Sequence, residues 1–460
     1  MKELIKDCLK KSDYRPEIDG LRAFAVICVI LNHLDKTLLP GGYLGVDIFF
    51  VISGFVITSS LYKRKDKNLK VFITKFYLRR IKRLIPALSF FVLVTSIVVC
   101  FFNPIPITSL RTGFASLFGL SNLYLAMQST NYFGQSTEFN AFVHTWSLGV
   151  EEQFYILFPI LFWFSGFGKK TKNGNRNLFF SMVSLTVASL TGFIYLYPVN
   201  QSLAFFLMPT RFWEIAVGSL VFILCKKQSY IEEILKKIPS LIVLLFIIGI
   251  MYLPTSWEVT STLLIVALSS LLIVSLKRNK PVYKLFTNSK VVFLGRISYS
   301  LYLWHWGIFS ISRWTIGIYW WSIPFQVFIL FIVSVFSYQC IEKPIRRIKE
   351  SKNIFIYLKG LGLFIFVSSC SYFLSINSAL LYSGERPKIE SIGTESLKSP
   401  LRRSFSGSKW NGKDCWFLSN DSWNLEKIIS KCSFGDFKNA SNRFIVLGNS
   451  YAPSFAAMFD

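Results

Sequence analysis

Long apolar segments recur along the whole chain and constrain its fold more than any other feature. A helix needs about 20 apolar residues to cross roughly 30 Å of hydrocarbon, and soluble domains rarely contain such segments. Eleven are present, at 21–38, 43–62, 84–102, 146–167, 178–197, 204–225, 238–253, 259–276, 291–310, 320–340 and 354–374. Only 17% of the 460 residues are charged, against roughly 25% in soluble domains. We therefore predict an all-α polytopic membrane protein with about 11 transmembrane helices.

The distribution of positive charge predicts the orientation in the membrane. The formal net charge is +26, and the loops between the predicted spans alternate between basic and nearly uncharged. One set of alternate loops carries 29 Lys and Arg residues, whereas the opposite set carries three, Lys36, Arg111 and Arg313. By the positive-inside rule, the N-terminus is expected in the cytoplasm and the C-terminal tail outside. Because the bilayer accounts for this charge, no nucleic-acid partner is expected.

Ionisable side chains at or inside the spans mark candidate functional residues, because each costs at least about 2.5–3.5 kcal/mol at the bilayer centre. The three histidines of the chain, His33, His144 and His305, all lie at or inside predicted spans. A lone histidine there is as often a packing residue, but three together favour chemistry. Arg22 and His33 are eleven residues apart, about three helical turns, and share one face with about 16 Å between them. That face is expected to line the bundle interior or a watery channel.

Carboxylates enter the spans from the predicted outer side. They are Asp47 in the second span and Glu151 and Glu152 in the fourth. A histidine needs an orienting or charge-balancing partner to take a proton near neutral pH, so histidines and carboxylates at this depth suit general acid/base chemistry. We interpret Arg211 and Glu214, one turn apart, as an internal ion pair with a structural role.

A basic segment, Tyr77–Arg83, opens the third predicted span. Its ordinary interpretation is anchoring at the cytoplasmic membrane surface. Its functional interpretation is a phosphate clamp, because Arg80 and Arg83 lie one turn apart and guanidinium groups match phosphate oxygens. No Cys and His cluster has metal-ligand spacing, so no metal is expected.

Several motifs between about residues 14 and 345 resemble the membrane-bound acyltransferase family 3. In chain order they are Tyr14-Arg15-Pro16-Glu17-Ile18-Asp19-Gly20-Leu21-Arg22-Ala23, Asn32-His33, the segment from Gly42 to Phe55, Arg80 with Arg83, the segment from His144 to Gln153, the segment from Arg296 to His305, and Glu342-Lys343-Pro344. Several long motifs in one order make a specific signal. The resemblance implies transfer of an acyl group, expected to be acetyl, from cytoplasmic acyl-coenzyme A (acetyl-CoA) to a hydroxyl of an extracytoplasmic glycan. It also implies a bacterial inner (plasma) membrane as the location.

The resemblance implies roles for particular residues. His33 and Arg22 match the Arg-x10-His signature, with His33 the catalytic histidine, and Arg22 is expected on the donor side. Arg80 and Arg83 match the Arg-x-x-Arg motif that is implicated in holding the phosphates of coenzyme A. We expect His33 to act as general base, oriented by Glu151 or Asp47, although a covalent acyl-histidine suits the same topology. Supporting roles are expected for Glu152, His144, Ser298, Tyr302 and His305.

The end of the chain is polar and is predicted to form an extracytoplasmic module. The expected domains are the acyltransferase domain at 14–345, an additional helix at 354–374 and a tail at 384–460. The family often carries an SGNH-type hydrolase-like domain in this place, and residues 444–452 resemble its first block, with Ser450 as the nucleophile.

The tail departs from the SGNH pattern in two ways. The residue before the serine is Asn449 instead of Asp, and no histidine follows His305. We therefore expect a short, truncated α/β tail, in which Ser450 acts only within a longer parent. Cys415 and Cys432 lie in this tail, where an oxidising compartment favours a disulfide, although their spacing alone leaves that pairing open.

Two other functional classes are compatible with many spans and intramembrane charges. One is a transporter or flippase that moves a glycan or lipid without chemistry. The other is a structural or sensory membrane protein. Transporters commonly show internal repeats, which are not evident here, and the ordered motifs oppose the second class. The acceptor stays open among peptidoglycan, lipopolysaccharide O-antigen, exopolysaccharide and secreted small glycosides.

Overall fold

The computed structural model describes residues 14–64, 66, 68–103, 106–128, 135–169, 171–227, 238–276, 280–348, 354–377, 381–382, 409–410 and 413–414. The chain divides into two units, Met1–Ser383 and Gly384–Asp460. In the second unit the described residues form two short antiparallel strands, β1 (Lys409–Trp410) and β2 (Lys413–Asp414). The candidate tail residues lie outside the described part of the chain, so the SGNH-like fold and the disulfide stay predictions; they are Ser450, Cys415 and Cys432.

The described residues of the first unit form helices and connecting turns. The helices up to residue 227 are α2 (Pro16–Leu34), α3 (Gly45–Tyr62), α4 (Leu69–Phe102), α5 (Ile107–Leu117), α6 (Ser121–Met127), α7 (Gln135–Glu138), α8 (Trp146–Phe164), α9 (Gly174–Val199), α10 (Gln201–Phe206) and α11 (Met208–Lys227). The later ones are α13 (Ser240–Ile250), α14 (Glu258–Ser275), α15 (Pro281–Phe286), α16 (Ser289–Arg296), α17 (Ser298–Trp314), α18 (Ile323–Phe336), α19 (Lys343–Arg347) and α20 (Ile354–Ile376). Single 3-10 turns precede three helices, and a π-helical segment joins α18 to α19; these are η1 (Gly42–Leu44), η2 (Val143–Thr145), η3 (Thr255–Trp257) and η4 (Ser337–Glu342).

Six segments in the described part of the chain are long and apolar enough to cross a membrane. They are Gly42–Tyr62, Leu69–Phe102, Gly174–Val199, Gln201–Cys225, Glu258–Ser275 and Ile323–Arg347. The other five predicted spans coincide with α2, α8, α13, α17 and α20, which are shorter over their described side chains or carry charges. All eleven predicted segments are therefore helical, and the number of crossings stays a prediction.

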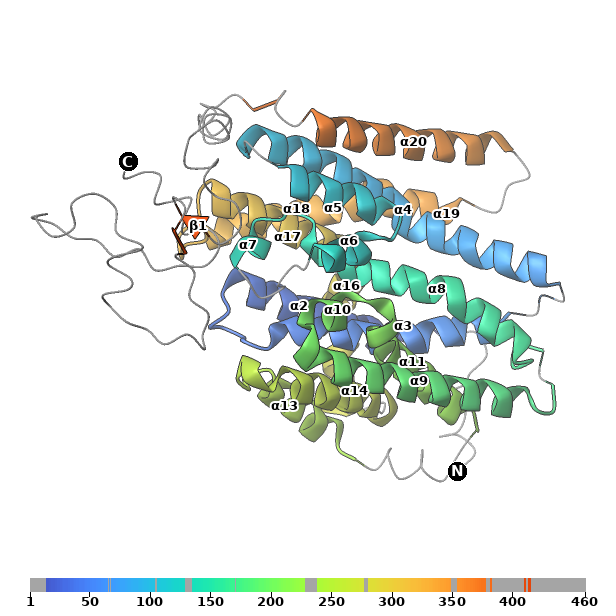
Figure 1. Cartoon of the computed structure of the whole chain (residues 1–460). Helices are drawn as coiled ribbons and strands as arrows, with labels where there is room; N and C mark the ends of the chain where they lie inside the picture. Colours follow the sequence, from blue (N-terminus) through green and yellow to red (C-terminus); the bar gives the residue numbers. More distant parts are fainter. Residues whose placement is uncertain are drawn as a thin grey trace, which may run out of the picture. The chain divides into compact units, whose positions relative to one another are not determined.

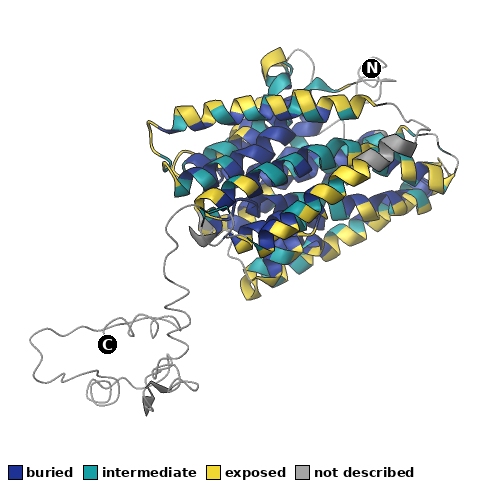
Figure 2. Ribbon diagram, turned by 90° about the horizontal axis from the view of Figure 1, so that it is seen from above, coloured by how far each residue is buried: buried dark blue, intermediate teal, exposed yellow. Residues whose placement is uncertain are grey.

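The first unit is a bundle in which the helices run roughly side by side (Figure 1). In that view α20 follows one edge, beside α4 and α5, whereas α13 and α14 follow the opposite edge. Buried residues gather on the inner faces of the helices, and exposed residues on the outer faces (Figure 2). The outer face of α18 presents Phe325, Phe328 and Phe331, each more than 40% exposed. Such an apolar surface suits contact with lipid rather than water.

Glycines allow α3 and α11 to approach each other closely. A Cβ atom at Gly54 would lie 1.8 Å from the carbonyl oxygen of Ile215, and one at Gly218 would lie 1.9 Å from that of Val51. Small residues at a crossing let the backbones of membrane helices meet. This crossing fixes the position of α3, which contributes one wall of the cavity described below.

Replacing Gly54 with alanine is expected to lower the thermal unfolding midpoint of the protein in nanodiscs. The added methyl group would overlap a backbone oxygen that cannot rotate away, and overpacking typically costs about 1–3 kcal/mol. Gly192→Ala on α9 is the matched control, because no atom lies within 4 Å of its Cβ position. The control is expected to match or slightly exceed wild type, since alanine favours helices. Equal midpoints for the two variants would contradict the close crossing.

Candidate active site

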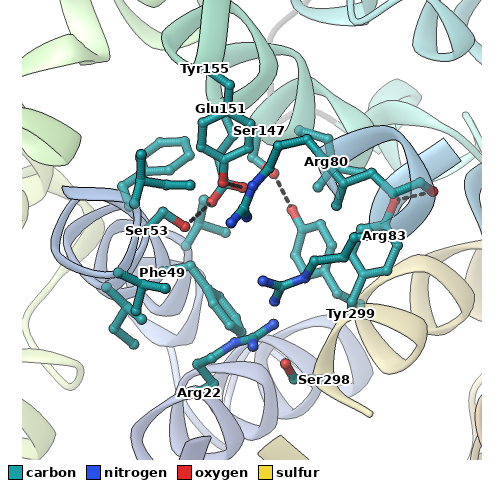
Figure 3. A pocket seen from close by; sticks show the side chains of 18 residues that line it. Arg22, Phe49, Ser53, Arg80, Arg83, Ser147, Glu151, Tyr155, Ser298 and Tyr299 are labelled. Carbon is teal, nitrogen blue, oxygen red and sulfur yellow. Dashed lines mark hydrogen bonds between the residues drawn. The ribbon is translucent and has the colours of Figure 1, made fainter. Parts of the chain in front are cut away.

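A cavity lies between five helices, α2, α3, α4, α8 and α17, and three arginines reach into it (Figure 3). Arg22 comes from α2, and Arg80 and Arg83 come from α4. Figure 3 shows their guanidinium groups pointing into the cavity from different sides. The cavity has a volume of about 80 Å³, which is room for several water molecules.

Two arginines of α4, Arg80 and Arg83, hold buried donor atoms that find no acceptor among the described residues. The guanidinium of Arg80 lies over the rings of Phe76 and Tyr155, at 5.6 and 5.5 Å from their centroids. In the part of the chain that the structure describes, the Nε atoms of Arg80 and Arg83 are buried without a hydrogen-bond partner. Buried donors normally have partners. An anion with several oxygens would satisfy both groups through charge-assisted hydrogen bonds.

One carboxylate, Glu151 of α8, faces the arginines among the residues that line the cavity. It accepts hydrogen bonds from Ser53 Oγ at 2.7 Å and from Tyr155 Oη at 2.9 Å. The lining therefore holds three guanidinium groups and one carboxylate, while Asp19, outside the lining, lies 3.8 Å from Arg22; basic groups outnumber acidic ones. A negatively charged ligand is the kind that this cavity favours.

A cluster of three buried histidines lies beside the cavity. His33 is on α2, His144 is in η2 and His305 is on α17, and each is at most 6% exposed. Nδ1 of His33 lies 3.0 Å from Nε2 of His305, and Nδ1 of His305 lies 2.6 Å from the carbonyl oxygen of Tyr302. The ring of His144 lies 5.5 Å from that of His305.

Tyr302 belongs to both the cavity and the histidine cluster. Together with Ser147 it lines the cavity, and the two hydroxyl groups are hydrogen-bonded at 2.7 Å. Its hydroxyl also donates to the carbonyl oxygen of His144, and its ring lies 5.3 Å from that of His305. Tyr302 and Ser147 thus form a partition between the arginines and the histidines. Ser298 also lines the cavity, and its buried hydroxyl has no hydrogen-bond partner among the described residues.

Charged residues close the opposite side of the histidine cluster. Arg313 donates from Nη2 to the backbone oxygen of His33 at 2.8 Å, and its Nε lies 3.3 Å from Glu138. Lys36 lies 2.6 Å from the same carboxylate. The ring of Trp306 meets that of His33 edge to face at 4.5 Å. These residues hold the end of α2 against α17.

The carboxylates that the sequence assigns to His33 have other partners in the structure, and their role toward His33 stays a prediction. Asp47 is buried on α3 and faces α11, where it lies 3.4 Å from Arg211. Arg211 also pairs with Glu214 at 2.5 Å, so the predicted internal ion pair is confirmed. Glu151 lies among the arginines, as described above. The ring of His33 forms a hydrogen bond with His305.

Other residues of the site occupy places that the sequence did not single out. Ser53 and Tyr155 hold Glu151, and Trp306 packs on His33. Tyr155 follows Glu151 by four residues, a spacing that places both on one helix face. The carboxylate of Glu152 lies close to Gly119. A Cβ atom added to Gly119 would lie 2.4 Å from an oxygen of that carboxylate. Within the described residues, no group of His, Cys, Asp and Glu could hold a metal ion.

Comparison with known protein families identifies the family of the chain that carries this site. The chain matches the family described as acyltransferase domain over residues 15–341. The chain belongs to this acyltransferase family. The arginine cavity and the histidine cluster both fall within the matched segment. The resemblance to acyltransferase family 3 is thereby confirmed, and the apolar helices support an integral membrane protein.

The chain is also similar to curated proteins of Staphylococcus aureus. It is 34% identical over 353 residues to the O-acetyltransferase OatA of strain NCTC 8325 / PS 47, which covers 73% of this chain and 57% of that relative. It is 33% identical over 359 residues to a protein of strain MSSA476 that carries an O-acetyltransferase name, covering 74% of this chain and 58% of that relative. The chain thus spans less than two thirds of the length of these relatives. No solved structure gives a significant match.

Proposed function

We propose that the protein is an O-acetyltransferase that moves an acetyl group from cytoplasmic acetyl-CoA to a hydroxyl of an extracytoplasmic glycan. The observation that carries this proposal is the position of Tyr302, which joins an arginine-lined cavity to a buried histidine cluster. The names of the O-acetyltransferase relatives support the class of reaction. The excess of basic over acidic groups in the cavity lining supports an anionic donor.

In this proposal the arginine cavity binds the phosphates of coenzyme A. Arg22, Arg80 and Arg83 supply guanidinium groups, and the buried Nε atoms of Arg80 and Arg83 have no acceptor in the part of the chain that the structure describes. Arg22 and His33 lie on the same helix, about 16 Å apart along its axis. A donor with its phosphates at one end and its thioester at the other needs such a separation. The pantetheine arm would pass Tyr302 to bring the thioester near His33.

The proposed reaction is a direct transfer. His33 takes the proton of the acceptor hydroxyl, the oxygen attacks the thioester carbonyl, and the carbon–sulfur bond breaks. The proton then passes from His33 to the departing thiolate, which leaves as free coenzyme A. Positioned acid/base groups of this kind contribute about 10²–10⁴ in rate. A covalent acetyl-His33 intermediate would bring the same groups together in two steps.

The proposal is tested with the protein in proteoliposomes, with radiolabelled acetyl-CoA supplied at the face that bears the basic loops. Separate samples contain peptidoglycan, lipopolysaccharide, exopolysaccharide or small glycosides at the other face. Base-labile label on one acceptor is the expected result, and the responding sample identifies the acceptor class. A glycan or lipid that crosses the bilayer without gaining label would instead favour a flippase and overturn the proposal. Label retained on the protein when no acceptor is present would indicate the acetyl-enzyme route.

A further inference from the structure

The hydrogen bonds of the histidine cluster determine which nitrogen of each ring carries a proton. Nδ1 of His305 lies 2.6 Å from the carbonyl oxygen of Tyr302. A carbonyl oxygen only accepts, so Nδ1 of His305 carries the hydrogen. In the neutral ring of His305 the lone pair is therefore on Nε2.

The same reasoning extends from His305 to His33. Nε2 of His305, which holds the lone pair, faces Nδ1 of His33 at 3.0 Å. The two ring planes are 9° apart and the ring centroids lie 5.2 Å apart. That separation equals the 3.0 Å between the nitrogens plus the short distance from each nitrogen to the centre of its own ring, so the rings lie nearly in line and the lone pair is directed at His33. An acceptor at this distance needs a donor, so Nδ1 of His33 carries the hydrogen. The neutral ring of His33 then has its lone pair on Nε2, the nitrogen that does not face His305.

We infer that His305 is a positioning residue that, together with the backbone carbonyl of Tyr302, holds His33 in the tautomer with Nε2 as the proton acceptor. The assignment of a base rests on the proposed function. When Nε2 of His33 takes the hydroxyl proton, the hydrogen bond from Nδ1 to His305 becomes charge-assisted and strengthens. When the proton passes on to the thiolate, the neutral tautomer is restored. His305 itself gains and loses no proton in this cycle.

Trp306 and Arg313 hold His33 in place through contacts that do not involve a hydrogen bond to its ring nitrogens. Trp306 meets the ring edge to face at 4.5 Å, and Arg313 binds the backbone oxygen of His33 rather than its side chain. His305 is completely buried, so water does not replace it as an acceptor while the cluster is closed. Without His305, neutral His33 is expected to shift toward the tautomer with a hydrogen on Nε2, which cannot act as a base.

The first test is spectroscopic and uses the full chain, without a polyhistidine tag, in lipid bilayers. The chain contains three histidines, so labelling histidine with ¹⁵N gives only three pairs of ring nitrogens. Nitrogen shifts and two-bond couplings to ring protons separate lone-pair from protonated nitrogens at each site. His33→Asn and His144→Phe provide the assignments. The expected result in the wild-type protein is a protonated Nδ1 and a lone-pair Nε2 for His33, and a protonated Nδ1 for His305.

Two variants of His305 provide the second test. His305→Phe keeps a ring but removes the acceptor, whereas the amide oxygen of His305→Gln can accept from Nδ1 of His33. His305→Phe is expected to move His33 toward the Nε2-protonated tautomer and to lower kcat by about 100-fold. Its KM for acetyl-CoA is expected to stay within about twofold of wild type, because the donor arginines are unchanged. His305→Gln is expected to restore the tautomer and at least about tenfold of the lost kcat.

The outcomes separate this inference from the proposed function. A wild-type His33 with a hydrogen on Nε2 would overturn the inference, even if His305→Phe does not fold. So would a His305→Phe protein whose His33 keeps the wild-type tautomer, or a His305→Gln protein as impaired as His305→Phe. The proposed function fails instead if the wild-type protein transfers no label to any acceptor, and the tautomers in the wild-type spectrum are determined independently of that result.

Discussion

A His33→Ala protein is expected to transfer acetyl groups at least about 1000-fold more slowly than wild type. The imidazole is the group that takes the hydroxyl proton in the proposed reaction, and acid/base groups contribute about 10²–10⁴ in rate. If the acetyl group passes through His33 itself, the loss is larger still. The measurement is initial transfer of radiolabel from acetyl-CoA to the acceptor in proteoliposomes, with equal amounts of inserted protein.

His33→Asn is the matched variant for this experiment. The amide nitrogen of asparagine can replace Nδ1 of histidine and donate to His305, so the hydrogen bond at 3.0 Å has a substitute. Asparagine offers no group in place of Nε2 that could serve as a base. The variant is expected to keep the thermal midpoint of wild type and to be as inactive as His33→Ala. A His33→Asn protein with normal activity would contradict the proposed role of His33.

Replacing Arg80 and Arg83 together with methionine is expected to lower kcat/KM for acetyl-CoA by at least about 100-fold. Each guanidinium would lose a charge-assisted hydrogen bond to phosphate, which is worth about 1.5–3 kcal/mol. The loss is expected to appear in KM rather than in kcat, because the histidine cluster is untouched. The measurements are steady-state kinetics and the rise in thermal midpoint on adding coenzyme A, which reports binding directly.

Arg79→Met provides the control for the loss of positive charge. Arg79 belongs to the same basic segment but is exposed, and its Nε donates to the backbone oxygen of Lys75 instead of lining the cavity. This variant is expected to retain the KM of wild type within about twofold. An equal rise in KM for Arg79→Met and the double variant would show that the basic segment only anchors the protein at the membrane surface. Arg80→Lys is expected to have a KM for acetyl-CoA between those of wild type and the double variant, since lysine keeps the positive charge but lacks the paired N–H donors of the guanidinium group.

The fold follows closely from the sequence because its main signal is local. Each of the eleven apolar segments coincides with a helix, since a long apolar run has few other ways to satisfy its backbone in lipid. The number of crossings does not follow as directly. The helices α2 and α8 carry charges that lower their apolar character, and the same charges serve the candidate site.

The histidines could be selected from the sequence because ionisable side chains are unusual in predicted spans, and the arginine pair because its spacing matches the family's Arg-x-x-Arg motif. The pairing of the carboxylates could not, because depth along a helix does not tell which neighbour the side chain faces. Asp47 has the depth expected for a partner of His33, but its face of α3 is turned to α11 and Arg211. Glu151 is turned to Ser53 and to the arginines of α4.

The role of His305 depends on its hydrogen bond to a backbone carbonyl oxygen, which no sequence pattern predicts. The acceptor that orients its ring is a backbone carbonyl, which every residue possesses. Only the three-dimensional structure shows that the Tyr302 carbonyl, His305 and His33 form one chain of hydrogen bonds. The inferred tautomer of His33 depends on both hydrogen bonds together, so it could not be predicted from any one of these residues.

The partition formed by Tyr302 and Ser147 has a consequence for the energy metabolism of the cell. An enzyme whose two substrates arrive from opposite sides of a bilayer risks becoming a leak for protons and small ions. The hydroxyl groups of Tyr302 and Ser147, bonded at 2.7 Å, and the buried rings of His144 and His305 beside Tyr302 lie where the donor arm would have to pass. A thioester arm that passes this point would itself fill the opening that it makes. If the proposed reaction holds, we expect little proton leak during turnover, because side chains or the donor occupy this place throughout.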